Sequence, residues 1–140
     1  MQDYVIGAYK SPNKKYGFDF LFEGEIRFGP QYYRVRLNGK ELKNRIFGFE
    51  FKWSNDSDYL ALQEWLTTDY ANGPDTALVI IDLDKKNVAR ISRAHGGFIV
   101  PLNFKDGKVI YQKKVLSRAQ ITEYEIELDK IENWTSLQTS

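Results

Sequence analysis

The sequence predicts an all-β protein, and three observations support that fold class. Apolar and polar residues alternate along several segments, as in residues 33–37 (YRVRL), which is the pattern of a strand with one buried face. Turn-forming residues cluster between these segments. No long segment has the apolar spacing of a helix, and only a terminal turn of helix is expected, over 128–134.

The first strand defined by this alternation spans 33–37 and ends at Asn38-Gly39, two residues that accept the positive φ angles of a tight hairpin turn. The next strand, over 47–53, has an aromatic side chain at every second position. These aromatic residues are Phe47, Phe49, Phe51 and Trp53. We interpret them as one wall of the core, because alternate residues of a strand share a face.

Six further strands follow, and polar turn sequences such as 55–58 and 84–87 lie between them. They are expected over 59–66, 76–83, 88–93, 98–104, 108–115 and 122–128. The run 78–81 (LVII) has no polar face, so its strand is expected to be central and covered on both sides. The predicted core comprises Phe49, Phe51, Trp53, Leu60, Val79, Ile81, Ile110 and Ile126.

The length of 140 residues fits one domain, residues 1–140, and 42% hydrophobic and 15% aromatic residues are enough for a core. We expect a single compact antiparallel β-sandwich or a flattened barrel. The first residues have neither the basic nor the apolar part of a signal peptide, and no apolar run reaches the ~20 residues of a membrane span. A cytoplasmic protein without membrane association is therefore expected.

Composition excludes several kinds of chemistry. Twenty Lys and Arg against nineteen Asp and Glu give a net charge of +1, which disfavours binding of a polyanion through bulk charge. The chain has no Cys, which excludes disulfides, thiolate metal sites and Cys nucleophiles, and one His, which excludes a multi-His metal centre. No phosphate-binding or dinucleotide-binding loop is present. Neither a cofactor nor a metal is expected.

Short turn-and-strand segments recur along the chain. Three of them are 11–18 (SPNKKYGF), 54–61 (SNDSDYLA) and 104–111 (FKDGKVIY), and strands ending at Leu37, Leu83 and Leu128 are spaced 46 and 45 residues apart. The copy at 53–61, followed by Ile81-Asp82-Leu83, resembles the blade repeat of TolB-like and WD40-like β-propellers. The resemblance implies a binding platform that carries its function in loops. About three units are too few for a ring of typically 4–8 blades, so a blade-like meander must bury its faces by another arrangement.

The polar insertion 66–75 is the predicted partner-binding loop, because recognition in β scaffolds is concentrated in long loops. Trp65 precedes it where the strand alternation breaks, so it either lies on the surface at a bulge or seals the end of the sheet. The predicted contact residues are Trp65, Asp69, Tyr70 and Asp75. Aromatic area flanked by carboxylates suits a protein partner with a basic surface.

Charge is segregated along the chain, which leaves a second surface open as an alternative. Residues 51–90 carry a net charge of −3 and residues 91–120 carry +5. The alternative basic patch consists of Tyr32, Arg34, Arg36, Lys113 and Lys114. Such a patch would suit an acidic protein or, because aromatic and basic residues interleave, single-stranded nucleic acid.

His95 in the polar loop AHGG is the one candidate for acid–base chemistry. It would need a carboxylate partner from Asp56, Asp69, Asp75 or Asp82; otherwise it is a turn histidine. The segment 55–58 (NDSD) alternates oxygen-bearing side chains as calcium loops do, but lacks the glycine and the distal glutamate, so a plain β-turn is expected.

These observations favour a non-catalytic protein-binding domain. Its size and composition are those of immunity-type or inhibitor-type intracellular proteins, and self-association into a homo-oligomer is compatible with them. The alternatives are a small ligand-binding or hydrolytic β-barrel that uses His95, and a single-stranded nucleic-acid binder.

Overall fold

The structure is a computed structural model that describes residues 4–139, and it confirms the all-β class and the antiparallel sandwich. Within that range there is no α-helix; two short 3₁₀ helices, η1 (Leu116–Arg118) and η2 (Leu128–Lys130), interrupt the strands. The second of these lies in the segment where a terminal helical turn was expected. No described helix has the length and apolar character needed to cross a membrane.

Most strands belong to one large antiparallel sheet with the order β1-β2-β3-β5-β6-β7-β8-β12, with β4 paired to β3. The bounds are β1 (Val5–Lys10), β2 (Gly17–Glu25), β3 (Gln31–Leu37), β4 (Lys40–Glu41), β5 (Ile46–Trp53), β6 (Tyr59–Trp65), β7 (Asp75–Asp82), β8 (Asn87–His95) and β12 (Thr135–Ser136). A second sheet has the order β11-β10-β9, with β9 (Gly97–Lys105), β10 (Lys108–Val115) and β11 (Gln120–Glu127). The described strand order does not close into a barrel.

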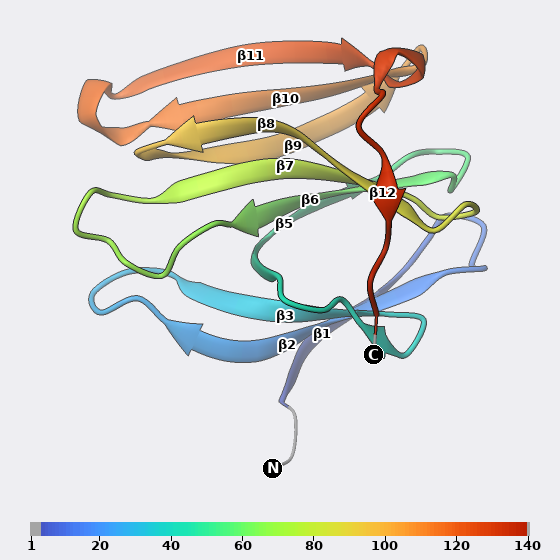
Figure 1. Cartoon of the computed structure of the whole chain (residues 1–140), viewed down its shortest axis with the longest axis horizontal. Coiled ribbons are helices and arrows are strands. Elements are labelled where there is room, and N and C mark those ends of the chain that lie inside the picture. The colour runs from blue at the N-terminus through green and yellow to red at the C-terminus, as the bar shows by residue number, and fades with distance from the viewer. Residues whose placement is uncertain (1–3, 140) are drawn as a thin grey trace.

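Figure 1 shows these strands stacked in three layers, with β1–β3 in the first, β5–β7 in the middle and β9–β11 in the third. Strand β8 is paired with β7 and passes from the middle layer toward the third, where it contacts β9 and β10. The first two layers belong to the same sheet, which bends so sharply that β3 and β5 are paired only at Tyr33 and Phe47. The third layer packs through β9 on β5, β6 and β7. The middle layer is therefore covered on both faces.

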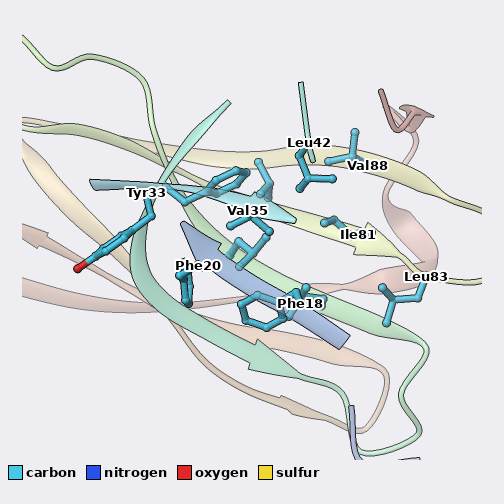
Figure 2. Close-up of a cluster of buried hydrophobic side chains, with 12 residues drawn as sticks. Phe18, Phe20, Tyr33, Val35, Leu42, Ile81, Leu83 and Val88 are labelled. Atoms are coloured by element: carbon cyan, nitrogen blue, oxygen red, sulfur yellow. The ribbon is translucent and has the colours of Figure 1, made fainter. Parts of the chain in front are cut away.

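The first core lies between the first and middle layers. Its buried residues are Phe18, Phe20, Tyr33, Val35, Leu42, Phe47, Leu60, Leu62, Val79, Ile81, Leu83 and Val88. Figure 2 shows Phe18, Phe20, Val35 and Ile81 directed into a common interior, with the Tyr33 hydroxyl pointing away at one end. The aromatic wall predicted for residues 47–53 contributes here, because Phe51 and Trp53 also pack against this cluster.

The second core lies between the middle and third layers. It consists of Ala61, Leu78, Ile80, Ala94, Ile99, Phe104, Val109 and Tyr111. Within 78–81, Val79 and Ile81 enter the first core, whereas Leu78 and Ile80 enter the second. The prediction of a central strand covered on both faces is confirmed.

The core prediction was wrong at Phe49, which is 41% exposed. A register shift between Phe47 and Phe51 breaks the alternation of β5, so Phe49 is displaced from the buried row. Leu60, Val79 and Ile81 are buried as predicted. The other predicted core residues are partly buried: Phe51, Trp53, Ile110 and Ile126.

The tight turn at Asn38-Gly39 is confirmed, since both residues have positive φ (49° and 80°). The strands predicted from residue 33 onward are present within two residues of their expected ends, but β1 and β2 were not predicted. Their alternation is interrupted, because β1 shifts register between Val5 and Gly7 and β2 has apolar residues on both faces over 20–22.

Two of the recurring turn segments have the same geometry. In 11–16, Asn13 Oδ1 accepts from Ser11 Oγ (2.8 Å) and from the Lys15 N–H (2.9 Å). In 54–59, Asp56 Oδ1 accepts in the same way from Ser54 Oγ (2.7 Å) and from the Asp58 N–H (3.0 Å). The third segment instead forms a two-residue turn at 106–107. Because one continuous sheet contains the first two units, the described strands show no propeller-like repeat.

Candidate functional site

An open cleft of about 320 Å³ lies where the three layers meet. Strands β3, β5, β6, β9 and β10 all contribute to its walls. Its lining residues are Pro30, Gln31, Tyr33, Gly48, Phe49, Glu50, Gln63, Trp65, Phe98, Val100 and Lys114. We call this set the aromatic cleft.

One wall of the aromatic cleft is the open end of the first core. The Phe49 ring stacks on Phe20 with a centroid distance of 4.6 Å and contacts Tyr33 at 5.5 Å. Phe22 is paired across the sheet with Tyr33 and is 37% exposed. Burial is the main reason that the pKa of Tyr33 is raised, with the neighbouring Tyr9 adding to it. Aromatic surface therefore continues from the buried core to solvent at this point.

The floor of the cleft is fixed by hydrogen bonds between buried side chains. Trp65 Nε1 donates to Gln63 Oε1 (2.9 Å), and Gln63 Nε2 donates to the Ile99 carbonyl of β9 (2.9 Å). Gly48 faces this pair so closely that an added Cβ would overlap Gln63 Oε1. This network connects the middle layer to the third layer and holds the indole in one orientation.

Trp65 is only 4% exposed, so the hypothesis that a bulge places it on the surface is wrong. The indole instead seals the end of the sheet, which is the second of the two positions expected from the sequence. Its ring is surrounded by Tyr32 at 6.2 Å, Tyr70 at 6.0 Å and Phe98 at 5.9 Å between centroids. The structure therefore places Tyr32, from the alternative patch, and the predicted loop residue Tyr70 against the same indole.

The loop 66–74 has internal hydrogen bonds that order it. The Asp69 N–H donates to Thr67 Oγ1 (2.9 Å), and the Ala71 N–H donates to Asp69 Oδ1 (2.9 Å). The Tyr70 hydroxyl is buried and has no hydrogen-bond partner among residues 4–139. Burial also raises the pKa of this phenol. The loop is thus preorganised, with one polar group left unsatisfied.

Carboxylates around the site fall into two groups. Asp75 receives two hydrogen bonds from the Arg93 guanidinium, and these are the main reason that its pKa is lowered. Asp69 and Glu50 are exposed and form no ion pair with any described residue. Asp69 and Glu50 are therefore available to a charged partner, whereas Asp75 is already paired with Arg93.

The alternative basic patch is not assembled as one surface. Arg34 is paired with Glu23 and Glu41, and Arg36 is paired with Asp19 at 2.9 Å. The lysines lie on β10, in a different layer from β3, and Lys113 packs over the Tyr124 ring at 5.1 Å. Lys114 alone of the charged members lines the aromatic cleft.

The site around His95 has a carboxylate neighbour but no enclosure. His95 Nδ1 lies 3.8 Å from Asp75 Oδ2, and the imidazole side chain is 74% exposed. Asp75 is already engaged by Arg93, so it is poorly placed to orient the imidazole. No described group of three or more His, Asp and Glu residues could hold a metal ion.

Sequence reasoning drew attention to Trp65 and Tyr70 as partner contacts but missed the other residues that line the cleft with Trp65. The strongest missed signal was Gly48, a glycine inside an alternating aromatic run, which is typical of a bulge that redirects its neighbours. Gln63 and Phe98 carried no local signal, because their roles depend on contacts between layers. A scan of protein-family models and searches of curated proteins and solved structures found no match for the chain.

Proposed function

We propose that the chain is a non-catalytic protein-binding domain that contacts its partner through the aromatic cleft and the loop 67–75. The observation that carries this proposal is the exposed Phe49 ring at the mouth of a cleft whose floor is fixed by hydrogen bonds. Exposed aromatic rings on rigid supports are typical binding hot spots, because they bury much area at little cost in conformational entropy.

The shape of the cleft supports a protein partner over a small molecule. Small-molecule sites of this volume usually enclose most of the ligand surface. Here the cleft is open, exposed Phe22 is paired with its lining residue Tyr33, and its lining residue Trp65 stacks on Tyr70 of the loop. This geometry suits one apolar side chain inserted from a larger partner surface. A hydrolytic site at His95 has less support, since that side chain lies exposed at the end of β8.

The charges around the cleft favour a partner with a basic rim. Glu50 and Asp69 lack ion-pair partners among the described residues, whereas Glu23, Glu41 and Asp75 are each paired with an arginine. A lysine or arginine of the partner would gain a charge-assisted contact at Glu50 or Asp69 without displacing an existing pair. Lys114 is the one cation in the cleft lining.

Site-specific photo-crosslinking tests the proposal. A photoreactive amino acid at position 50 or 69 should give the same crosslinked protein in native cell extract, while Lys15 and Asn55 serve as exposed control positions at the opposite end of the sheet. A crosslink from the first pair only supports the proposal. Equal capture from all four positions, crosslinks to nucleic acid alone, or no capture would contradict it.

Once the crosslinked partner is identified, two conservative variants test the contributions of the loop charge and the loop phenol. Asp69→Asn keeps an oxygen acceptor for the Ala71 N–H and removes only the charge, so it should slow association and flatten its salt dependence. Tyr70→Phe removes a buried hydroxyl that has no partner in the described residues, so the free protein should become equally or more stable. If the on-rate is unchanged in Asp69→Asn, the proposed basic rim is wrong.

A further inference from the structure

Strand β11 leaves a long, regular edge open at one side of the third layer. All eight of its residues are paired with β10 without a register shift, and no described strand lies on its other side. The remaining sheet edges differ: β1 is shifted at Gly7, and β8 is partly covered by β12. The backbone of β9 is hydrogen-bonded to the side chains of Thr76 and Gln63. An open edge of this length is a template for strand addition.

The backbone register identifies the groups that face outward. The Leu128 N–H donates to the Gly107 carbonyl (2.9 Å), toward β10. Because antiparallel strands alternate between bonded and non-bonded pairs, Ile126, Tyr124 and Thr122 also point their backbone groups toward β10. The outward backbone groups belong to Ile121, Glu123, Glu125 and Glu127.

The side chains of β11 form two rows of different chemistry. Thr122, Tyr124 and Ile126 form the core-side row: Tyr124 stacks on buried Tyr111 at 5.6 Å, and Ile126 packs against the second core. Ile121, Glu123, Glu125 and Glu127 form the other row, which we call the acidic row. Tyr124 and Ile121 remain 40% and 63% exposed, so an added strand would cover apolar area on both rows.

The acidic row opposes pairing with a second copy. Consider two copies of β11 paired antiparallel with both acidic rows on one face of the sheet. In a register centred on Glu123, Glu123 of one copy lies opposite Glu123 of the other. In a register centred on Tyr124, Glu123 of one copy lies opposite Glu125 of the other. Like charges directly opposite one another destabilise a sheet. Within the described chain Glu125 and Glu127 already contact Lys108 (3.2 Å) and Lys130 (3.3 Å), whereas Glu123 has no such contact.

We propose that β11 accepts an extended segment of another protein as an added strand, with lysine or arginine on the acidic row and apolar residues on the core-side row. Charge complementarity selects this occupant: a cation opposite Glu123 pairs an unpaired carboxylate, and apolar residues on alternate positions cover Tyr124 and Ile126. The surface is distinct from the contact surface of the proposed function, so either can fail without the other.

Amide hydrogen exchange measured by NMR on the full chain tests this docking. The probe is a capped octapeptide that alternates lysine with valine; the controls are a peptide of the same composition with its lysines clustered and a peptide with glutamate in place of lysine. At about 90% occupancy, exchange at Ile121, Glu123, Glu125 and Glu127 should slow about tenfold with the alternating peptide. The amides of Thr122, Tyr124 and Ile126, already bonded to β10, should change less.

Two variants at one position separate the backbone contribution from the charge. Glu123→Pro removes an outward N–H and no bond to β10, a substitution that edge strands tolerate, and should abolish peptide protection. Glu123→Gln should weaken binding and reduce its salt dependence while keeping the same pattern of protected amides.

Three results would overturn the proposal. The first is no protection by the alternating peptide up to millimolar concentration. The second is equal protection by the clustered peptide. The third is protection of the same amides by increasing protein concentration alone, which identifies a second copy as the occupant. The wild-type exchange map decides among these outcomes even if Glu123→Pro does not fold.

Discussion

The two outer layers are held to the middle layer in different ways. The first layer, β1–β3, is part of the same hydrogen-bonded sheet as the middle layer and shares with it a core rich in aromatic side chains. The third layer, β9–β11, belongs to a separate sheet. Its edge strand β9 is bound by side chains: Thr76 Oγ1 donates to the Gly97 carbonyl (3.0 Å) and accepts from the Ile99 N–H (2.9 Å).

This difference shows how two buried polar residues replace a neighbouring strand. Gln63 and Thr76 are 4% and 0% exposed, yet Gln63 Nε2 and Thr76 Oγ1 are hydrogen-bonded to the backbone of β9. An unpaired backbone group in that position would cost about 1–3 kcal/mol. Because one edge of the third layer is satisfied in this way, its other edge, β11, is the one left for a partner.

The largest expected effect breaks the aromatic attachment of the first layer. Phe20→Ala should reduce the free energy of unfolding by about 3–5 kcal/mol, because Phe20 is fully buried and supports Phe49 and Tyr33. Urea denaturation measures this loss. The matched control is Phe22→Ala on the same strand face, where the side chain is 37% exposed and a smaller loss is expected. Equal losses in the two variants would show that Phe20 is not a core residue.

A smaller effect tests the polar attachment of the third layer. Thr76→Val keeps the shape of the side chain and leaves the Gly97 carbonyl and the Ile99 N–H unpaired, so a loss of about 1–3 kcal/mol is expected. Thr76→Ser retains the hydroxyl and should lose less. Urea denaturation and exchange at the Ile99 amide measure both effects. If the valine variant is as stable as the serine variant, packing alone attaches β9.

The comparison also shows what the sequence can and cannot predict. The run 78–81 predicted a strand covered on both faces because each of its four side chains is apolar, a local property. Thr76 and Gln63 carry no equivalent signal, since a polar residue in a strand is normally assigned to the solvent face. Phe49 was assigned to the core because alternation contains no information about a register shift. Gln63 and Phe49 both line the aromatic cleft, so the position of the cleft required the tertiary structure.

The next prediction concerns a polar contact between the first and middle layers. The Asn13 N–H donates to Ser57 Oγ (2.9 Å), joining two turns that differ in having Asn13 and Asp56 at equivalent positions. The pKa of Asp56 is lowered, mainly because the Ser54 hydroxyl donates to its carboxylate. A lowered folded pKa contributes stability above the unfolded value of about 3.9, and this contribution is lost as pH falls through the folded pKa.

Asp56→Asn should therefore retain the turn, as Asn13 does in the first turn, and lose less stability than the wild type as pH falls from about 5 toward 3. Urea denaturation at several pH values measures this difference. Asn13→Asp is the reciprocal control and should add acid sensitivity. Parallel stability curves for the wild type and Asp56→Asn would show that this carboxylate has the same pKa in the folded and unfolded states.

The smallest expected effect concerns the connection that leads from the middle layer into the third. His95 ends β8 just before the turn to β9, and its imidazole lies 3.8 Å from an Asp75 oxygen that Arg93 already binds. His95→Ala should change the free energy of unfolding by no more than about 0.5 kcal/mol, as at ordinary exposed positions. Arg93→Ala, which removes the main partner of Asp75, should cost more and should raise the pKa of that carboxyl. Urea denaturation of both variants and NMR titration of Asp75 provide the measurements. A larger loss in His95→Ala than in Arg93→Ala would mean that the histidine, and not the arginine, holds Asp75 beside the turn into the third layer.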